Sequence, residues 1–204
     1  AKKAIIEHLD CFGNPSSSYE LGRQSRLLIE DARERIAKCI NAEPDEIYFT
    51  SGGSEANTWI TKNKPVLCSG IEHHSLNGWN ALENDNHGVV NISTLQKCLD
   101  DWCGDIQIND DIIISCMAVN NEIGTIQPIK DIANITHNNE FIFHTDAVQA
   151  VGHIPIDVKK LGVDILSASA HKFSGPKGVG FLYVKKGVKI NKLINGGKQE
   201  SNLR

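Results

Sequence analysis

The decisive stretch of this sequence is Ser167-Ala168-Ser169-Ala170-His171-Lys172-Phe173-Ser174-Gly175-Pro176-Lys177-Gly178. The apolar residues 163–166 precede it, and Ser-Gly-Pro turn chemistry follows the lysine. Lys172 is therefore expected where a buried strand meets a loop, after residues too small to crowd a ligand. Such a lysine could form a Schiff base with an aldehyde. The alternative is an ordinary surface lysine at a turn.

Strand-like and helix-like segments alternate on both sides of this stretch. Expected strands are residues 47–50, 65–68, 89–92, 112–119, 141–145, 164–170 and 179–184. Expected helices are residues 2–10, 16–41, 74–84, 95–102 and 129–137, and one that starts at Ser54 as N-cap. This order predicts an α/β fold with three layers (αβα) and one mixed, mostly parallel sheet. The last two strands are joined too closely for a helix crossover, so we expect them to be antiparallel.

Composition excludes several classes of protein. The 204 residues are 40% hydrophobic and carry a formal net charge of −4 without a basic stripe, so nucleic acid is not an expected partner. The longest apolar run, residues 112–119, is too short to span a bilayer, and no membrane association is expected. The six cysteines form no CxxC motif, and Cys68 and Cys116 are expected to be reduced core residues. A reducing, cytoplasmic location fits this pattern.

Five polar clusters follow the expected strands, at the sheet edge where ligands of parallel α/β proteins gather. They are residues 51–54, 71–74, 120–122, 146–149 and 169–172. Gly52, Gly53 and Ser54 open a helix and could bind a phosphate through free backbone N–H groups, although a simple helix cap would look the same. Asp146 ends an apolar strand and could hold a protonated pyridine nitrogen, or else cap a helix or pair with an arginine.

Histidines complete the set of candidate groups. His73 could stack on a planar ring or move a proton, whereas His73, His74, His144 and His171 together lack the spacing of a metal site. A lysine, a buried carboxylate, an imidazole and a phosphate cup are the parts that a pyridoxal phosphate enzyme needs.

With these residues in place, the sequence resembles the cysteine desulfurases, within the class V aminotransferases and the fold-type I pyridoxal phosphate enzymes. The resemblance runs nearly end to end. The motifs that carry it are Gly13-Asn14-Pro15-Ser16-Ser17, Phe49-Thr50-Ser51-Gly52-Gly53-Ser54-Glu55-Ala56-Asn57, Glu72-His73, residues 119–129, residues 144–152, Ser167-Ala168-Ser169-Ala170-His171-Lys172 and residues 175–180.

The resemblance implies a role for each matching residue. Lys172 would hold the pyridoxal 5′-phosphate covalently and, with His73 stacked on the ring, would move protons. Asp146 would bind the pyridine nitrogen and Gln149 the phenolic oxygen. The phosphate would be held by Gly53, Ser54, Ser169 and His171. Asn121 would lie beside the ring and substrate, with Asn14 as a second substrate-binding residue.

The same resemblance implies the reaction and the partners. L-cysteine would give L-alanine and an enzyme-bound persulfide, for iron–sulfur cluster assembly or another sulfur-transfer pathway. A homodimer and a sulfur-acceptor protein are expected. Residues 1–204 would be the cofactor-binding large domain, incomplete at both ends, and the nucleophilic cysteine and the small C-terminal domain would lie beyond Arg204. Alternatives are another class V enzyme, such as a selenocysteine lyase or an aminotransferase, and a non-catalytic scaffold domain.

Overall fold

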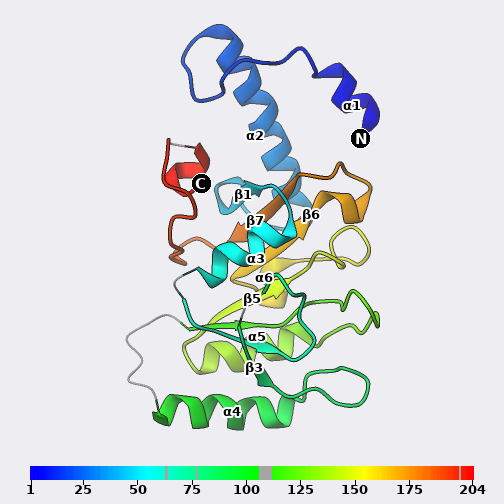
Figure 1. The fold of residues 1–204 in the computed structure, drawn as a ribbon, viewed down its shortest axis with the longest axis vertical. Coiled ribbons are helices and arrows are strands. Elements are labelled where there is room, and N and C mark those ends of the chain that lie inside the picture. The colour runs from blue at the N-terminus through cyan, green and yellow to red at the C-terminus, as the bar shows by residue number, and fades with distance from the viewer. Residues whose placement is uncertain (63, 77, 106–111, 198) are drawn as a thin grey trace.

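The computed structural model describes residues 1–62, 64–76, 78–105, 112–197 and 199–204. A seven-stranded sheet with the order β1-β7-β6-β5-β4-β2-β3 forms its centre (Figure 1). The strands are β1 (Ile47–Thr50), β2 (Val66–Ser69), β3 (Trp79–Leu82), β4 (Ile113–Ser115), β5 (Ile142–Asp146), β6 (Ile165–Ser169) and β7 (Gly180–Val184). The α-helices are α1 (Lys2–Glu7), α2 (Glu20–Ile40), α3 (Gly53–Thr61), α4 (Ile92–Asp105), α5 (Ile129–Asn138) and α6 (Val158–Leu161).

The sheet is mixed, as the sequence predicts. Strands β3, β2, β4, β5 and β6 run parallel to one another, in that order across the sheet. Strand β7 runs antiparallel to both β6 and β1, which confirms the expectation from the short connection. The predicted three-layer α/β fold is therefore present, and the carboxyl ends of the parallel strands share one edge.

Two apolar cores cover the two faces of the sheet. One core joins residues of α2, α4, α5 and α6 to side chains such as Leu67, Phe143 and Leu166. The other joins Trp59 and Ile60 of α3 to alternate strand residues and to Leu203 near the C-terminus. This alternation follows from the strand period of two residues. Both faces are buried, which is typical of a mostly parallel sheet.

Two sequence-based predictions of secondary structure are wrong. The described residues of 74–84 form no helix, and β3 instead pairs with β2 through Leu67 and Trp79. A side chain at Gly78 would come within 2.8 Å of the Val66 carbonyl oxygen, so the chain passes close to β2 before it pairs. The strand expected over 89–92 is reduced to a single bridge between Asn84 and Val90.

Side chains accept backbone hydrogen bonds where two predicted strands are shorter than expected, and one predicted helix cap also differs. The Val90 N–H donates to Gln127 Oε1 at 2.9 Å, in place of a strand partner. The Met117 N–H donates to Glu72 Oε1 at 2.8 Å, and β4 ends at Ser115, well before the expected residue 119. Helix α3 has Gly52, and not Ser54, at its N-cap.

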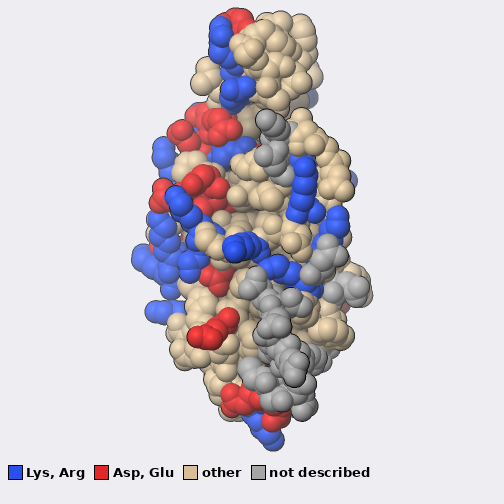
Figure 2. Space-filling model, turned by 90° about the vertical axis from the view of Figure 1, so that its left-hand side faces the viewer, with Lys and Arg blue, Asp and Glu red and all other residues tan. Residues whose placement is uncertain are grey.

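The surface and the cysteines are consistent with a globular chain. Lys and Arg side chains are interspersed with Asp and Glu side chains on the face shown in Figure 2. Cys68 and Cys116 are buried in the core, as predicted. In the described ranges, no helix is long and apolar enough to cross a membrane.

Candidate active site

A cavity of about 260 Å³ opens where the carboxyl ends of β5 and β6 meet the N-terminus of α3. All but one of the ten site residues predicted from the sequence line it. The lining residues are Gly53, Ser54, Asn57, His73, Ser75, Met117, Asn121, Asp146, Val148, Gln149, Ser169, His171 and Lys172. The fold therefore brings together side chains that are up to 119 positions apart in sequence (from 53 to 172).

The exception is Asn14, which is exposed and does not line the cavity. Its Oδ1 accepts a hydrogen bond from the Ser16 N–H at 2.9 Å, and its own N–H donates to the Tyr19 hydroxyl at 3.0 Å. In this structure Asn14 organises the loop that leads into α2.

The N-terminus of α3 forms one end of the cavity. Its first backbone N–H groups have no partner within the helix, and the helix dipole adds a partial positive charge there. A Cβ at Gly53 would lie 2.5 Å from Val148 Cγ2, so only a glycine lets the helix start this close to the loop after β5. Ser169 Oγ lies 2.9 Å from His171 Nδ1 on the opposite wall. This end of the cavity suits an anion.

Asp146 lies at the floor of the cavity and is 3% exposed. Its Oδ1 accepts the Val148 N–H at 2.9 Å, and its Oδ2 accepts Asn57 Nδ2 at 2.7 Å. Burial raises the pKa of Asp146, and these hydrogen bonds and the nearby His73 oppose that rise. A cationic N–H donor entering the cavity would stabilise this carboxylate.

A directed chain of hydrogen bonds joins Asp146 to His73. Asn57 Nδ2 donates both to Asp146 and to Ser75 Oγ, the latter at 2.9 Å. Ser75 Oγ, which accepts from Asn57, lies 2.7 Å from His73 Nδ1. The Ser75 N–H also donates to Nδ1 at 3.1 Å. The imidazole nitrogen Nδ1 is therefore an acceptor, and the ring carries its proton on Nε2.

Lys172 is fixed through its backbone, while its side chain reaches the cavity. It lies in the short 3-10 helix Ala170–Phe173 that follows β6. Its carbonyl oxygen accepts His153 Nε2 at 2.8 Å. Among the described residues, Nζ of Lys172 forms no ion pair or hydrogen bond. The amine is thus free for a ligand.

Sequence reasoning missed four residues that line the cavity: Asn57, Ser75, Met117 and Val148. Asn57 lies one helical turn after Gly53, so the spacing from the predicted phosphate turn could have indicated it. Its Oδ1 is buried without a hydrogen-bond partner, which leaves an acceptor available at the cavity. Ser75, two residues after His73, carried no local signal.

Sequence reasoning also did not single out the buried carboxyl group of Glu72. Its Oε1 accepts Ser69 Oγ at 2.6 Å and the Met117 N–H, whereas its Oε2 is buried and unpaired. Burial, with a smaller contribution from Asp146, raises the pKa of Glu72 to about 7, although the two hydrogen bonds oppose this rise. A group with this pKa can be neutral or ionised near physiological pH.

His144 does not line the cavity and instead contacts the two neighbouring strands of the sheet. It is fully buried, its Nδ1 lies 2.7 Å from Ser115 Oγ, and its Nε2 lies 3.0 Å from Ser167 Oγ. Burial lowers the pKa of His144 to about 3, so the ring is neutral and links β4, β5 and β6. No group of three or more potential metal ligands occurs in the part of the chain that the structure describes.

The cavity fits pyridoxal phosphate by its donor set. An open helix N-terminus faces a serine and a histidine, a buried carboxylate lies at the floor, and a free lysine amine stands at the wall. The glycine at position 53 lets Val148 close one wall of the cavity beside the start of α3. Gly53, Ser54, Ser169 and His171 would hold the phosphate, Asp146 the ring nitrogen, and Lys172 the aldehyde carbon.

Comparisons with known proteins agree with this geometry. The aminotransferase class-V family model matches residues 2–203. The chain is 49% identical to cysteine desulfurase IscS of Dictyoglomus turgidum (strain DSM 6724 / Z-1310), covering 95% of this chain and 52% of that protein. Among solved structures, a NifS-like protein superposes with a TM-score of 0.87 at 38% identity, over 100% of this chain and 60% of that one.

A second solved structure, SspA in complex with cysteine, has a TM-score of 0.86 at 33% identity and covers 99% of this chain and 64% of that one. The chain spans about half the length of the curated relatives it matches.

Proposed function

Because this chain belongs to the class-V aminotransferase family, we propose that the protein is a pyridoxal-phosphate-dependent cysteine desulfurase. The curated relatives with 45–49% identity carry that name. The observation that carries the proposal is the meeting of Lys172, Asp146 and the open N-terminus of α3 around one cavity. These three features are the ones that bind the aldehyde, the ring nitrogen and the phosphate of this cofactor.

When bound, the cofactor supplies an electron sink for the carbanion formed at the substrate α-carbon. Asp146 would keep the ring nitrogen protonated, because a buried carboxylate stabilises a cation beside it. Asn57 holds Asp146 Oδ2 and thereby fixes the carboxylate plane. His73 presents its Nε2–H, since its Nδ1 is occupied by Ser75.

Lys172 has two tasks on this proposal. Its amine would hold the cofactor, and the same amine would move the α-proton as a base. The hydrogen bond from His153 fixes the backbone from which this side chain extends. Asn121 lies at the cavity mouth beside the position proposed for the substrate.

The proposed substrate is L-cysteine. One structural neighbour is in complex with cysteine, and it shares 33% identity over 99% of this chain. An enzyme thiolate would attack the substrate sulfur, giving L-alanine and a persulfide, with no external oxidant needed. None of the described residues lining the cavity is a cysteine, so the thiol would approach from another part of the protein. We also propose a homodimer, a sulfur-acceptor protein and a cytoplasmic location.

The test is production of L-alanine and sulfide from L-cysteine by the full-length protein with added pyridoxal phosphate and a thiol reductant. Lys172→Ala should abolish turnover and the covalent adduct that borohydride traps. Lys177→Ala, an exposed lysine in the same loop, is the matched control and should retain both. Turnover by Lys172→Ala above the free-cofactor background would refute the proposed role.

A further inference from the structure

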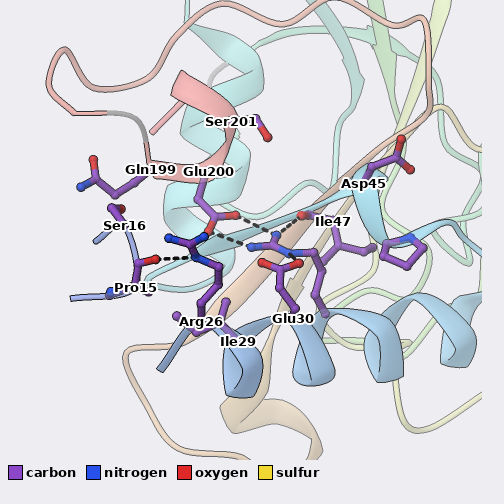
Figure 3. A pocket seen from close by; sticks show the side chains of 12 residues that line it. Pro15, Ser16, Arg26, Ile29, Glu30, Asp45, Ile47, Gln199, Glu200 and Ser201 are labelled. Atoms are coloured by element: carbon purple, nitrogen blue, oxygen red, sulfur yellow. Dashed lines mark hydrogen bonds and ion pairs between the residues drawn. The ribbon is translucent and has the colours of Figure 1, made fainter. Parts of the chain in front are cut away.

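The C-terminal segment 199–204 is held against the sheet and its helices by two arginine–carboxylate pairs. In the first, Arg33 of α2 contacts Glu200 through Nη1–Oε2 at 3.0 Å and Nη2–Oε1 at 3.1 Å. Glu200 Oε2 also accepts the Phe49 N–H of β1 at 2.8 Å. Figure 3 shows Glu200 pointing from this segment towards α2 and the start of β1.

The second pair lies next to the candidate active site. Arg204 Nη2 contacts Glu55 Oε2 at 3.1 Å, and Arg204 Nε contacts Glu55 Oε1. Glu55 Oε2 also accepts the Ser51 N–H at 2.9 Å. Glu55 is the third residue of α3, directly after Gly53 and Ser54, which line the cavity. The pair therefore links the C-terminal segment to the turn that would bind the phosphate.

Glu55 poses an electrostatic problem for that phosphate. Burial alone would raise the pKa of Glu55, but hydrogen bonds from Arg204 and Ser51 lower it to about 2, so the side chain is ionised. A carboxylate in the first turn of a helix is favourable for the helix itself. The same charge repels a phosphate dianion at that helix N-terminus, and the repulsion is strong where water is partly excluded. The side chains of Glu55 and Arg204 are only 17% and 31% exposed.

We propose that the Glu55–Arg204 pair positions the anion-binding turn and makes it electrically compatible with a phosphate. Glu55 fixes the backbone at Ser51, and Arg204 cancels the charge that this fixation introduces. Both are positioning residues, since neither lines the cavity. The inference rests on the proposed function, because the anion is the phosphate of the proposed cofactor.

The test compares two ligands that differ only in the phosphate. The dissociation constants of pyridoxal phosphate and pyridoxal are measured by equilibrium dialysis for the full-length protein and its variants. Arg204→Ala should weaken pyridoxal phosphate binding by about tenfold and change pyridoxal binding less than twofold, because the unpaired Glu55 repels only the phosphate. The double variant Glu55→Gln/Arg204→Ala should recover most of this loss, since Gln can still accept the Ser51 N–H.

Control variants distinguish this role from a general loss of folded structure. Arg35→Ala removes an arginine from an exposed pair with Asp31 on α2 and should change neither dissociation constant. If Arg204→Ala does not fold by circular dichroism, Glu55→Gln alone decides, and it should retain or improve pyridoxal phosphate binding. Equal weakening of both ligands, or no recovery in the double variant, would overturn the inference. The inference would also be wrong if Glu55→Gln no longer bound pyridoxal phosphate more tightly than pyridoxal.

Ligand binding by the unsubstituted protein distinguishes a failure of the proposed function from a failure of this inference alone. If it binds neither ligand, the proposed function fails, and the inference fails with it. If it binds pyridoxal phosphate tightly and all variants bind equally well, the inference alone is wrong.

Discussion

Replacing Glu72 with glutamine should change the free energy of unfolding, relative to the unsubstituted protein, more favourably at pH 8 than at pH 5. Glu72 has a pKa of about 7 in the folded chain and an ordinary value of 4.5. The folded state therefore binds more protons than the unfolded state between these pH values, and its stability falls as pH rises through them. At 1.36 kcal/mol per pKa unit, ionisation of Glu72 costs the folded protein at most about 3 kcal/mol.

Glutamine removes this dependence without emptying the site. Its carbonyl oxygen can still accept the Ser69 hydroxyl and the Met117 N–H, which bind Oε1 of Glu72. The amide nitrogen replaces the unpaired Oε2, so part of the gain is offset by a buried donor. We therefore expect the change from pH 5 to pH 8, and not the absolute stability at either pH, to report the ionisation.

Urea unfolding of both proteins at pH 5 and pH 8 measures this change. The free energy of unfolding of Glu72→Gln minus that of the unsubstituted protein should rise by about 2–3 kcal/mol between the two pH values. Glu34→Gln, at an exposed position of α2, should show no such rise. A constant difference between Glu72→Gln and the unsubstituted protein would show that Glu72 ionises normally and would refute the reasoning.

Three further substitutions address the site, the sheet and the thiol. Asp146→Asn should weaken pyridoxal phosphate binding and lower turnover more than binding, as measured by dialysis and alanine production, because the ring nitrogen loses its charge partner. His144→Ala should lower the free energy of unfolding in urea by about 2–4 kcal/mol, since it leaves a cavity and two buried hydroxyl groups with a lost partner. Cys11→Ser should leave sulfide release unchanged, because Cys11 is exposed and does not line the cavity; loss of release would identify Cys11 as the sulfur acceptor.

The sequence predicted the main strands and the polar residues at their ends for one physical reason. A polar side chain directly after a buried apolar run must lie at a strand end, and parallel strands bring those ends to one edge. Asp146 and Lys172 were both indicated in this way, and both line the cavity. The paired glycines before a helix start likewise indicated the turn at Gly53.

The remaining features depend on contacts that no local pattern encodes. Strand β3 has a sequence without clear periodicity, and pairing with the open edge of β2 decided its conformation. Asn57 and Ser75 acquired partners only when α3 packed against the sheet. The raised pKa of Glu72 also depends on burial by residues far away in sequence, so composition could not indicate it.

The contact between Gly53 and Val148 has a consequence for how this site can vary. The Cγ2 methyl group of Val148 occupies the volume that a side chain at position 53 would need. A single replacement at position 53 therefore meets a steric barrier, whereas shortening position 148 first would open a route to alanine at position 53. Mutational paths through this site should depend on the order of the steps. A library that varies the two positions together should recover functional pairs that single-site scanning would discard.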